Sequence, residues 1–256
     1  MHYCLLLTAC IKPEQVTINP IIRIDPAIRM QDYFSALKFW LGYEQTYFDS
    51  IVFVENSSSD LFLLRNLVAK ENKFNLKVEF LQFQSSPVPD GVHYGYSELE
   101  MIDFAFDHSK LIANTTHIIK ITGRLYFPQL IRLLKWIPKG IEFASDSRDY
   151  TIASRDEHYI VTTLFIVEKR FYASLLYDAK STMNTIFEYS LEETLYFQIL
   201  KPLYIKGIHH IILRLPFTLS PVGFGAHWNV NYNSFKKQTA TLLRDFARII
   251  IPAFWI

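Results

Sequence analysis

The first half of the chain alternates short apolar runs with segments whose apolar residues recur at helical spacing. Residues 4–9, 51–54 and 117–123 are rich in β-branched, aromatic and other apolar side chains, a composition typical of strands. Residues 29–41, between the first two runs, and residues 97–111, before the third, place apolar side chains on one helical face. This alternation predicts an α/β fold, with a mostly parallel central sheet and helices on both faces.

The second half contains the same types of element in a less regular order. No internal repeat, low-complexity tract or linker rich in Pro and Gly divides the sequence, so we expect a single domain over residues 1–256. The further predicted elements are strands at 78–83, 141–145, 159–167 and 209–215, and helices at 60–67, 128–137, 190–200 and from Phe235 onward.

The composition is that of a folded globular protein. Of the 256 residues, 50% are hydrophobic and 16% are aromatic, enough to bury a large core. The formal net charge of +1 argues against nucleic acid as a partner, because its phosphates attract a concentrated basic surface. Cys4 and Cys10 provide neither a disulfide framework nor a zinc spacing, which favours a reducing compartment. The N-terminal run MHYCLLLTAC lacks a basic leader and is too short to span a membrane, so we expect a cytoplasmic protein.

Three of the predicted strands end in polar residues. The first ends at Thr8-Ala9-Cys10, the second in the cluster 55–60, and the third in the run 120–124. In open α/β sheets, ligands bind outside the carboxyl ends of the strands, where loops converge. We therefore expect a binding site at this edge. For the cluster 55–60 a capped turn is the alternative, because Ser, Asn and Asp are common turn and N-cap residues.

The order of these elements resembles the nucleotide-binding half of GT-A fold glycosyltransferases, above all the family 2-like enzymes. The second strand ends in VENSSSD, and those enzymes have a pattern like V-D-N-x-S-x-D there, whose first acid contacts the base or ribose of a nucleotide sugar. The resemblance implies a Rossmann-like GT-A domain, with a nucleotide-sugar-binding half at about 1–128 and an acceptor-binding, catalytic-base half at 129–256. The implied donor-nucleotide contacts are Thr8, Ala9, Glu55, Asn56, Ser58 and Glu98.

The sequence departs from this family at the end of the strand 117–123. The fold usually carries D-x-D here to hold a divalent cation on the diphosphate, whereas this chain reads Thr122-Gly123-Arg124. Because fixed cations can also neutralise a diphosphate, we predict that Lys120 and Arg124 do so, and that the transfer is independent of metal. The Thr122 hydroxyl would form a hydrogen bond with the ligand, and Gly123 would let the backbone approach it closely. Solvated flanking charges at Lys120 and Arg124, and a site for Mg²⁺ or Mn²⁺, are the alternatives.

Two later segments add candidates for the diphosphate and the sugar. His227, in a glycine-containing loop, is a candidate donor to phosphate, with a simple loop histidine as the alternative. Asp146, Arg148 and Asp149 follow a predicted strand, but their spacing does not match D-x-D. An ion pair or turn, a displaced carboxylate site for a metal, and contacts with the donor sugar all remain open for these three residues.

Inverting enzymes of the resembled family use a carboxylate base at the start of a helix beyond the donor site. The segment SLEETLYFQILK provides one, and we predict Glu193 as the base, with Glu192 as second choice. A helix N-terminus favours ionised carboxylates. An ordinary capping box between Ser190 and Glu193 is the structural alternative.

The resemblance implies transfer of a sugar from a nucleotide donor to a hydroxyl of a glycan or lipid-linked glycan, in bacterial lipopolysaccharide or capsule synthesis. The final segment, from Phe235, is basic and amphipathic, so we expect either peripheral contact with the inner face of the cytoplasmic membrane or docking on the core. A sugar nucleotidyltransferase is an alternative, although no Gly-rich phosphate loop with a basic residue follows the first strand. A non-catalytic module that binds nucleotide sugar or glycan is another.

Overall fold

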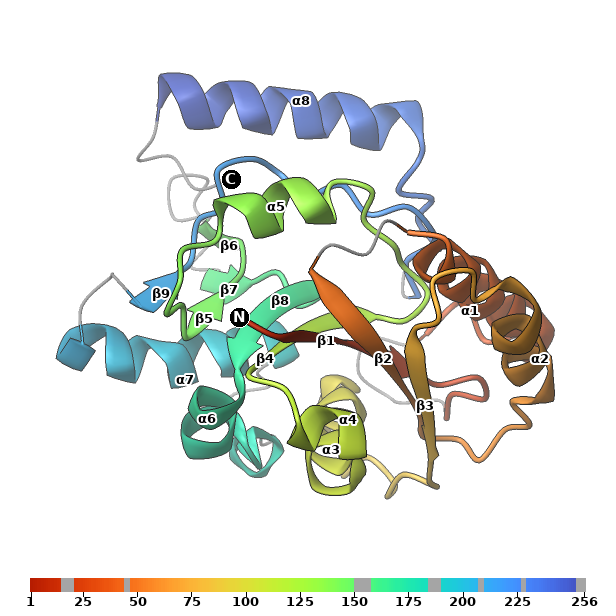
Figure 1. The fold of residues 1–256 in the computed structure, drawn as a ribbon. Coiled ribbons are helices and arrows are strands. Elements are labelled where there is room, and N and C mark those ends of the chain that lie inside the picture. Colours follow the sequence, from red (N-terminus) through yellow and green to blue (C-terminus); the bar gives the residue numbers. More distant parts are fainter. Residues whose placement is uncertain are drawn as a thin grey trace.

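A computed structural model describes residues 1–14, 21–43, 47–149, 158–183, 190–206, 210–226 and 229–251. Within them, a central sheet has the strand order β3-β2-β1-β4-β8-β5-β9 (Figure 1). The first four strands of that order are parallel to one another, whereas β8 runs antiparallel to β4 and to β5. The sheet strands are β1 (Tyr3–Ala9), β2 (Phe48–Glu55), β3 (Lys77–Gln82), β4 (His117–Thr122), β5 (Phe143–Ala144), β8 (Leu164–Glu168) and β9 (Ile211–Ile212).

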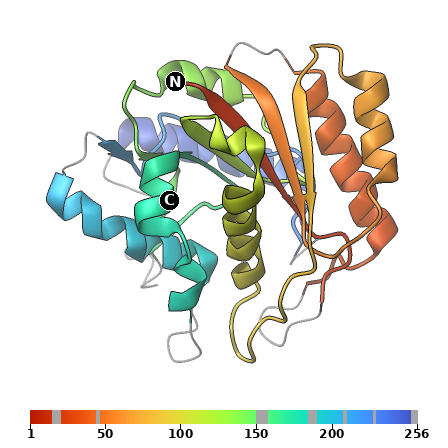
Figure 2. The same ribbon diagram turned by 60° about the horizontal axis from the view of Figure 1, so that its bottom comes forward.

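Helices cover both faces of this sheet (Figures 1 and 2), and the prediction of a mostly parallel α/β fold is confirmed. Helices α1, α2 and α5 lie on one face, and α3, α4, α6 and α7 lie on the other. The helices are α1 (Pro26–Leu41), α2 (Phe62–Glu71), α3 (Gly95–His108), α4 (Lys110–Ala113), α5 (Leu130–Trp136), α6 (Lys169–Phe171), α7 (Leu191–Lys206) and α8 (Phe235–Ile250). The described elements also include η2 (Tyr172–Leu176), η3 (Ala179–Thr182) and a small sheet of β6 (Ser147–Asp149) and β7 (His158–Ile160).

The alternation of side chains along β1 divides the core into two layers. Leu5 and Leu7 are fully buried with α1 on one face, and Cys4 and Leu6 are fully buried with α3 on the other. Successive side chains of a strand point to opposite faces, so a strand buried on both sides is mainly apolar rather than alternating. Burial of each large apolar side chain contributes roughly 1.5–3 kcal/mol.

Local signals in the sequence fix where α1 begins and ends. The Asp25 carboxylate accepts hydrogen bonds from the amides of Ala27 and Ile28, at 2.8 and 3.1 Å. Pro26 occupies the first turn, where a missing N–H costs nothing, and Gly42 follows the last residue. The helix therefore starts three residues before the predicted position 29 and ends as predicted at residue 41.

Two predicted elements are divided in the structure. The predicted helix 97–111 breaks at Ser109, whose hydroxyl caps α4 by accepting from the Ile112 amide at 3.0 Å. The predicted strand 159–167 becomes β7 and β8, separated by the turn 161–163. The second break matters more, because this turn lies at the same edge as the ends of the parallel strands.

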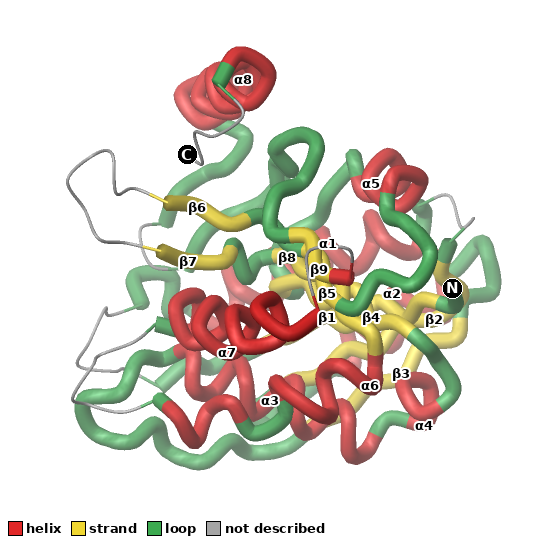
Figure 3. Tube along the Cα trace, turned by 90° about the vertical axis from the view of Figure 1, so that its left-hand side faces the viewer, coloured by secondary structure: helices red, strands yellow, loops and turns green. Residues whose placement is uncertain are grey.

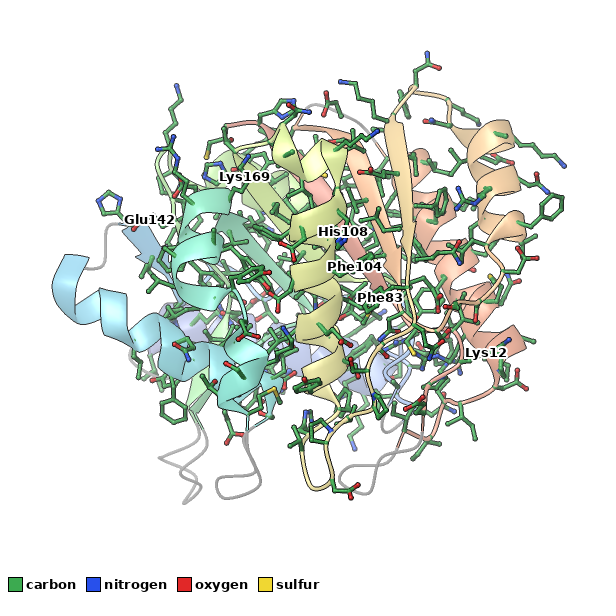
Figure 4. The ribbon with its side chains drawn as sticks, turned by 90° about the horizontal axis from the view of Figure 1, so that it is seen from below. Lys12, Phe83, Phe104, His108, Glu142 and Lys169 are labelled. Atoms are coloured by element: carbon green, nitrogen blue, oxygen red, sulfur yellow. The ribbon has the colours of Figure 1, made fainter. Side chains whose placement is uncertain are left out.

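A row of stacked rings fixes α3 against the chain that follows β3. The rings of Phe83 and Phe104 stack with their centroids 4.2 Å apart, and those of Phe104 and His108 with theirs 4.0 Å apart (Figure 4). This packing holds the C-terminal half of α3 beside the sheet. The N-terminal turn of α3, with Glu98, thereby lies at the ends of the strands.

Helix α8 lies outside these layers, at one margin of the molecule (Figure 3). Its Arg248 is buried, whereas most of its large apolar side chains are exposed. No described helix combines the length and the hydrophobicity needed to cross a bilayer.

Candidate functional site

The carboxyl ends of β1, β2 and β4 open onto one cavity of about 240 Å³, which we call the strand-end cavity. Its walls also include the start of α3, the turn 162–163, the start of α7 and the residues Gly225, Ala226, Val230 and Tyr232. Six residues predicted for the site line it: Thr8, Asn56, Glu98, Thr122, Arg124 and Glu192.

Two buried polar atoms in the wall of this cavity have no hydrogen-bond partner among the described residues. They are Oδ1 of Asn56 and Nε of Arg124. A buried polar group without a partner costs about 1–3 kcal/mol, so a ligand group or an ordered water that pairs with either atom would be stabilising. One atom is an acceptor and the other a donor, which suits a ligand that carries both kinds of group.

Arg124 is a fixed positive charge in this cavity. Its pKa is raised above the usual range: burial opposes the charge, but the neighbouring Tyr33 hydroxyl and the Glu98 carboxylate favour it more strongly. Nη1 of Arg124 lies 3.5 Å from the Tyr33 hydroxyl. That hydroxyl also accepts from the Cys10 amide at 2.8 Å and from Nη2 of the buried Arg29 at 3.2 Å. Arg124 is thus held by a phenol that two other groups keep in position.

Lys120 lies beneath the cavity and is paired with Glu98. Its fully buried ammonium donates to Oε1 of Glu98 at 2.6 Å and to the Thr162 carbonyl at 2.8 Å. The same Glu98 oxygen accepts from the Thr8 hydroxyl at 2.9 Å, so one carboxylate joins β1, α3 and β4. Lys120 itself does not line the cavity. Of the two predicted cations, Arg124 reaches the cavity, and Lys120 holds a carboxylate that does.

Glu55 is fully buried and organises the loops above it. Its Oε1 accepts from the amides of Ile11 and Ser57, at 3.1 and 3.0 Å, and from the Ser57 hydroxyl. Its Oε2 accepts from the Ser59 amide at 3.0 Å. The chain after β1 is therefore tied to the chain after β2 through this carboxylate. Glu55 stands behind the lining residue Ser57 and does not line the cavity itself.

The remaining predicted residues of the strand ends, Ala9, Ser58 and Gly123, do not line the strand-end cavity. A Cβ on Gly123 would come 2.7 Å from the Thr8 carbonyl oxygen, so the close approach made here is to the backbone of β1. The Gly123 amide donates to that same carbonyl at 2.8 Å. Ala9 is buried, and Ser58 is exposed with a positive φ of 49°.

Glu192 is the carboxylate of α7 that faces the cavity. Thr162, in the turn between β7 and β8, donates its hydroxyl to Oε1 of Glu192 at 2.6 Å. The pKa of Glu192 is raised from its usual value of 4.5, chiefly by burial and further by the charge of Glu98, while the Thr162 bond opposes the rise. The pKa of Glu98 is lowered: burial opposes ionisation, but Lys120 more than offsets it. Two neighbouring carboxylates with opposite pKa shifts are characteristic of sites that transfer protons.

Glu193, the first choice for the base, takes part in a capping box. Its Oε2 accepts from the Ser190 amide and hydroxyl, both at 2.9 Å, and its own amide donates to the Ser190 hydroxyl at 3.2 Å. The structure thus shows the capping box between Ser190 and Glu193 that is the alternative to a catalytic base at Glu193. Glu193 does not line the strand-end cavity, whereas Glu192 does.

The candidates for sugar or metal contact divide among several places. Asp146 is buried and forms an ion pair with Arg248 of α8, and it accepts from the Leu215 amide at 3.3 Å. Of the alternatives for this residue, the structure therefore shows an ion pair, with Arg248 as the partner. Arg148 lines a second cavity. The side chain of Asp149 and the whole of His227 lie outside the described residues.

The second cavity, of about 220 Å³, adjoins the first, and we call it the α8 cavity. Both are lined by Thr162, Thr163, Glu192 and Tyr232. Its other lining residues are Arg148, Tyr159, Val161, Thr218, Leu219, Ser220, Pro221, Lys237, Thr241 and Arg244. Glu192 thus stands where the two cavities meet.

Sequence reasoning missed several residues that build these cavities. Arg29 and Tyr33 are four residues apart on α1, and their polar ends reach the loop after β1. An arginine on the apolar stripe of a predicted helix was the available signal, because a buried arginine requires partners. Thr162 gave no signal, because it lies within a run that reads as one continuous strand. Tyr94, by contrast, was expected at the rim of the site, and it lines the first cavity. Burial, followed by the charges of Glu192 and Glu98, raises its pKa well above the usual value.

Among the described residues, no group of three or more His, Cys, Asp or Glu is arranged to hold a metal ion. At the end of β4, Thr122 provides a hydroxyl, Gly123 has no side chain and Arg124 provides a guanidinium. Mg²⁺ and Mn²⁺ prefer carboxylate and other oxygen ligands, so a guanidinium in the wall does not fit such an ion.

No protein-family model matches the sequence, and no curated protein matches it. Among solved structures, the mannosyltransferase PcManGT from Pyrobaculum calidifontis, in complex with GDP-Man and Mn²⁺, superposes with a TM-score of 0.51 at 11% identity. The match covers 96% of this chain and 64% of that chain, so this chain spans less than two thirds of the mannosyltransferase.

Two further solved structures are similar at lower scores. An inositol-1-phosphate CTP transferase from T. maritima has a TM-score of 0.47 at 10% identity, over 96% of each chain. A core-mannan synthase from Aspergillus fumigatus, in its Mn/GDP form, has a TM-score of 0.46 at 9% identity, over 77% of this chain and 69% of that chain. The likeness to the mannosyltransferase shows that this chain has a GT-A-like fold.

Proposed function

We propose that this protein is a glycosyltransferase that moves a sugar from a nucleotide sugar to a hydroxyl of a glycan or lipid-linked glycan. The observation that carries the proposal is the composition of the strand-end cavity, which Arg124 and Glu192 both line. A cation there suits a leaving diphosphate, and a carboxylate of raised pKa suits an attacking hydroxyl. The GT-A-like fold, with the cavity at the ends of its parallel strands, agrees with this use.

The donor occupies the strand-end cavity in this account. The nucleoside lies against Thr8 and Asn56, whose unpartnered Oδ1 accepts from the base or ribose. The diphosphate lies against the Arg124 guanidinium, which presents several donors in one plane. Lys120 and Glu55 act through others: the first holds Glu98 and the second holds Ser57.

The chemistry assigned to the site is a single displacement with inversion. The acceptor oxygen forms a bond to the anomeric carbon while the bond between that carbon and the diphosphate oxygen breaks. Glu192 takes the proton of the acceptor hydroxyl, and Arg124 stabilises the negative charge that develops on the departing diphosphate. No step requires a metal ion, in keeping with the residues at the end of β4.

We place the reaction at the inner face of the bacterial cytoplasmic membrane, in synthesis of lipopolysaccharide or capsule. The supporting observation is that α8 is docked through polar side chains and turns its apolar ones outward. Thr241 and Asp245 contact Ser220 and Thr218, at 3.0 and 2.6 Å. The exposed large apolar residues of the segment are Phe235, Leu242, Leu243, Phe246, Ile249, Ile250 and Ile251. A helix that presents an apolar face beside basic residues suits the surface of an anionic bilayer.

The experiment that tests the proposed function is a thermal-shift screen of nucleotide sugars, each with and without EDTA or added Mn²⁺. A donor that binds the folded protein raises its apparent stability by mass action. We expect a shift for at least one nucleotide sugar, unchanged by the chelator. A shift produced by a nucleoside triphosphate together with a sugar phosphate, and by no nucleotide sugar, would instead assign the protein to the nucleotidyltransferases. A shift that requires Mn²⁺ would contradict the fixed-cation account.

A further inference from the structure

We propose that the α8 cavity binds a carboxylate or phosphate group of the acceptor. The identification of this ligand as the sugar acceptor rests on the proposed function. Thr8 and Asn56 line the strand-end cavity and not the α8 cavity, whereas Glu192 lines both.

The charges in the wall of the α8 cavity are of predominantly one sign. Arg148, Lys237 and Arg244 line it, and among its described lining residues Glu192 is the one carboxylate. A concave surface with several cations concentrates field lines and attracts anionic groups. Carboxylate and phosphate groups form charge-assisted hydrogen bonds with such cations, about twice as strong as those of a neutral hydroxyl, so this wall favours a ligand that carries negative charge.

Helix α8 is fixed so that its cationic stripe faces this cavity. Lys237, Thr241 and Arg244 are four and three residues apart, a spacing that places them on one face of a helix. Arg248 continues the same stripe and is buried, where it pairs with Asp146 and donates to the Leu215 carbonyl at 2.7 Å. The buried anchor at one end sets the rotation of α8 about its axis.

An unpartnered buried atom in the same wall points independently to a ligand. The Thr218 hydroxyl oxygen is buried and has no hydrogen-bond partner among the described residues, although the Thr218 amide donates to Asp245 at 2.6 Å. Thr218 lines the α8 cavity together with the three cations. A hydroxyl beside cationic groups is the combination that binds carboxylate and phosphate oxygens.

The position of this cavity connects charge recognition to the reaction. Thr162, Thr163, Glu192 and Tyr232 line both cavities, so a ligand in the α8 cavity meets the carboxylate that faces the donor. An anionic group held by Arg148, Lys237 and Arg244 would orient a neighbouring hydroxyl toward Glu192. Charge in the acceptor thereby acts as a positioning device as well as a source of affinity.

The test measures binding of small probes by saturation-transfer NMR and calorimetry. The probes are methyl β-D-glucuronide, its neutral counterpart methyl β-D-glucoside, and glucose 6-phosphate, so the carboxylate and phosphate sources are separate arms. For the wild-type protein we expect at least one anionic probe to bind about tenfold more tightly than the neutral one, a difference of about 1.4 kcal/mol. The double variant Lys237→Gln/Arg244→Gln should lose this preference. Lys236→Gln, a change at an exposed neighbour on α8, should keep it.

Two further measurements separate this inference from the proposed function. The preference should persist in Arg124→Gln, which removes the cation of the strand-end cavity, and the melting temperature of each variant verifies that it is folded. Equal binding of neutral and anionic probes by the wild type, or an undiminished preference in a folded Lys237→Gln/Arg244→Gln variant, overturns the inference. If no nucleotide or nucleotide sugar binds but the anion preference and its loss are both observed, the proposed function fails and the anion site stands.

Discussion

The Thr162 hydroxyl donates a hydrogen bond to Oε1 of Glu192 at 2.6 Å, while the Thr162 carbonyl accepts one from the Lys120 ammonium at 2.8 Å. Lys120 in turn holds Glu98, so a continuous network joins the two carboxylates of the strand-end cavity. Within it, the pKa of Glu98 is lowered and that of Glu192 is raised. Relative to an ordinary carboxyl group, the network favours the ionised form of Glu98, and burial favours the protonated form of Glu192.

Glu192→Gln should lower the rate of sugar transfer by about 10²- to 10⁴-fold, the usual contribution of a general base. The amide keeps the size of the side chain but does not take a proton. Donor affinity should change little, because the role proposed for Glu192 is on the acceptor. The measurement is the transfer rate at saturating donor, alongside donor affinity by calorimetry.

Glu193→Gln provides the matched control for that variant. Glutamine preserves the capping box with Ser190, so this variant should stay folded and retain transfer. Loss of transfer in Glu193→Gln with normal turnover in Glu192→Gln would restore Glu193 as the base.

The pH dependence of activity and that of stability should have opposite signs at Glu192. Transfer should rise as the pH passes upward through the raised pKa of Glu192, because the base must be ionised. Stability should fall over the interval between the usual value of 4.5 and the raised pKa, since there the folded state binds more protons than the unfolded state. Glu192→Gln should therefore be more stable than the wild type at neutral pH. Denaturant unfolding of both proteins across pH measures this, and an unchanged difference between pH 4 and 7 would speak against it.

Lys120→Met should destabilise the protein by about 3–5 kcal/mol, because it leaves Glu98 without its buried partner. The double variant Lys120→Met/Glu98→Gln should recover part of this loss, since a neutral amide is less costly to bury than a carboxylate. The free energies of unfolding in urea give the comparison. Equal stability of the single and double variants would show that the unpaired Glu98 carboxylate is not the source of the loss.

The double variant Leu243→Glu/Phe246→Glu should reduce binding to vesicles of phosphatidylglycerol and phosphatidylcholine by about tenfold or more. Both side chains lie on the exposed face of α8 and contribute apolar area to the contact. Co-sedimentation measures the bound fraction, with Phe62→Glu, an exposed change on α2, as the control. Membrane contact would be contradicted if the wild-type protein did not bind such vesicles and instead dimerised through this face.

The fold was predictable because its signals are local. The buried strands are mainly apolar, and Asp25, Pro26 and Gly42 mark the ends of α1 in the sequence itself. The break between β7 and β8 was missed, because the run 159–167 is β-branched and aromatic without a turn signal. The polar turn that supplies Thr162 was hidden inside this run.

The sequence predicted which strand ends meet at one edge, but not the contacts that each residue makes there. The rule on strand ends pointed to residues that share one cavity in the structure, whereas the partners of Lys120 and Glu55 come from elements distant in sequence. The choice between Glu192 and Glu193 depends on the rotation of α7 about its own axis. Adjacent residues of a helix point about 100° apart, and tertiary packing decides which of them faces the cavity.

The central claim is that Arg124 faces the diphosphate of a nucleotide in the strand-end cavity. Its most direct test compares the affinities of a nucleoside diphosphate and of the corresponding nucleoside for the wild type, Arg124→Gln and the surface control Lys135→Gln. We expect Arg124→Gln to weaken binding of the nucleoside diphosphate by about 2 kcal/mol, roughly 30-fold, and to leave the affinity for the nucleoside unchanged. Lys135→Gln should bind both compounds as the wild type does. Equal weakening of diphosphate and nucleoside, or none of either, would contradict the claim.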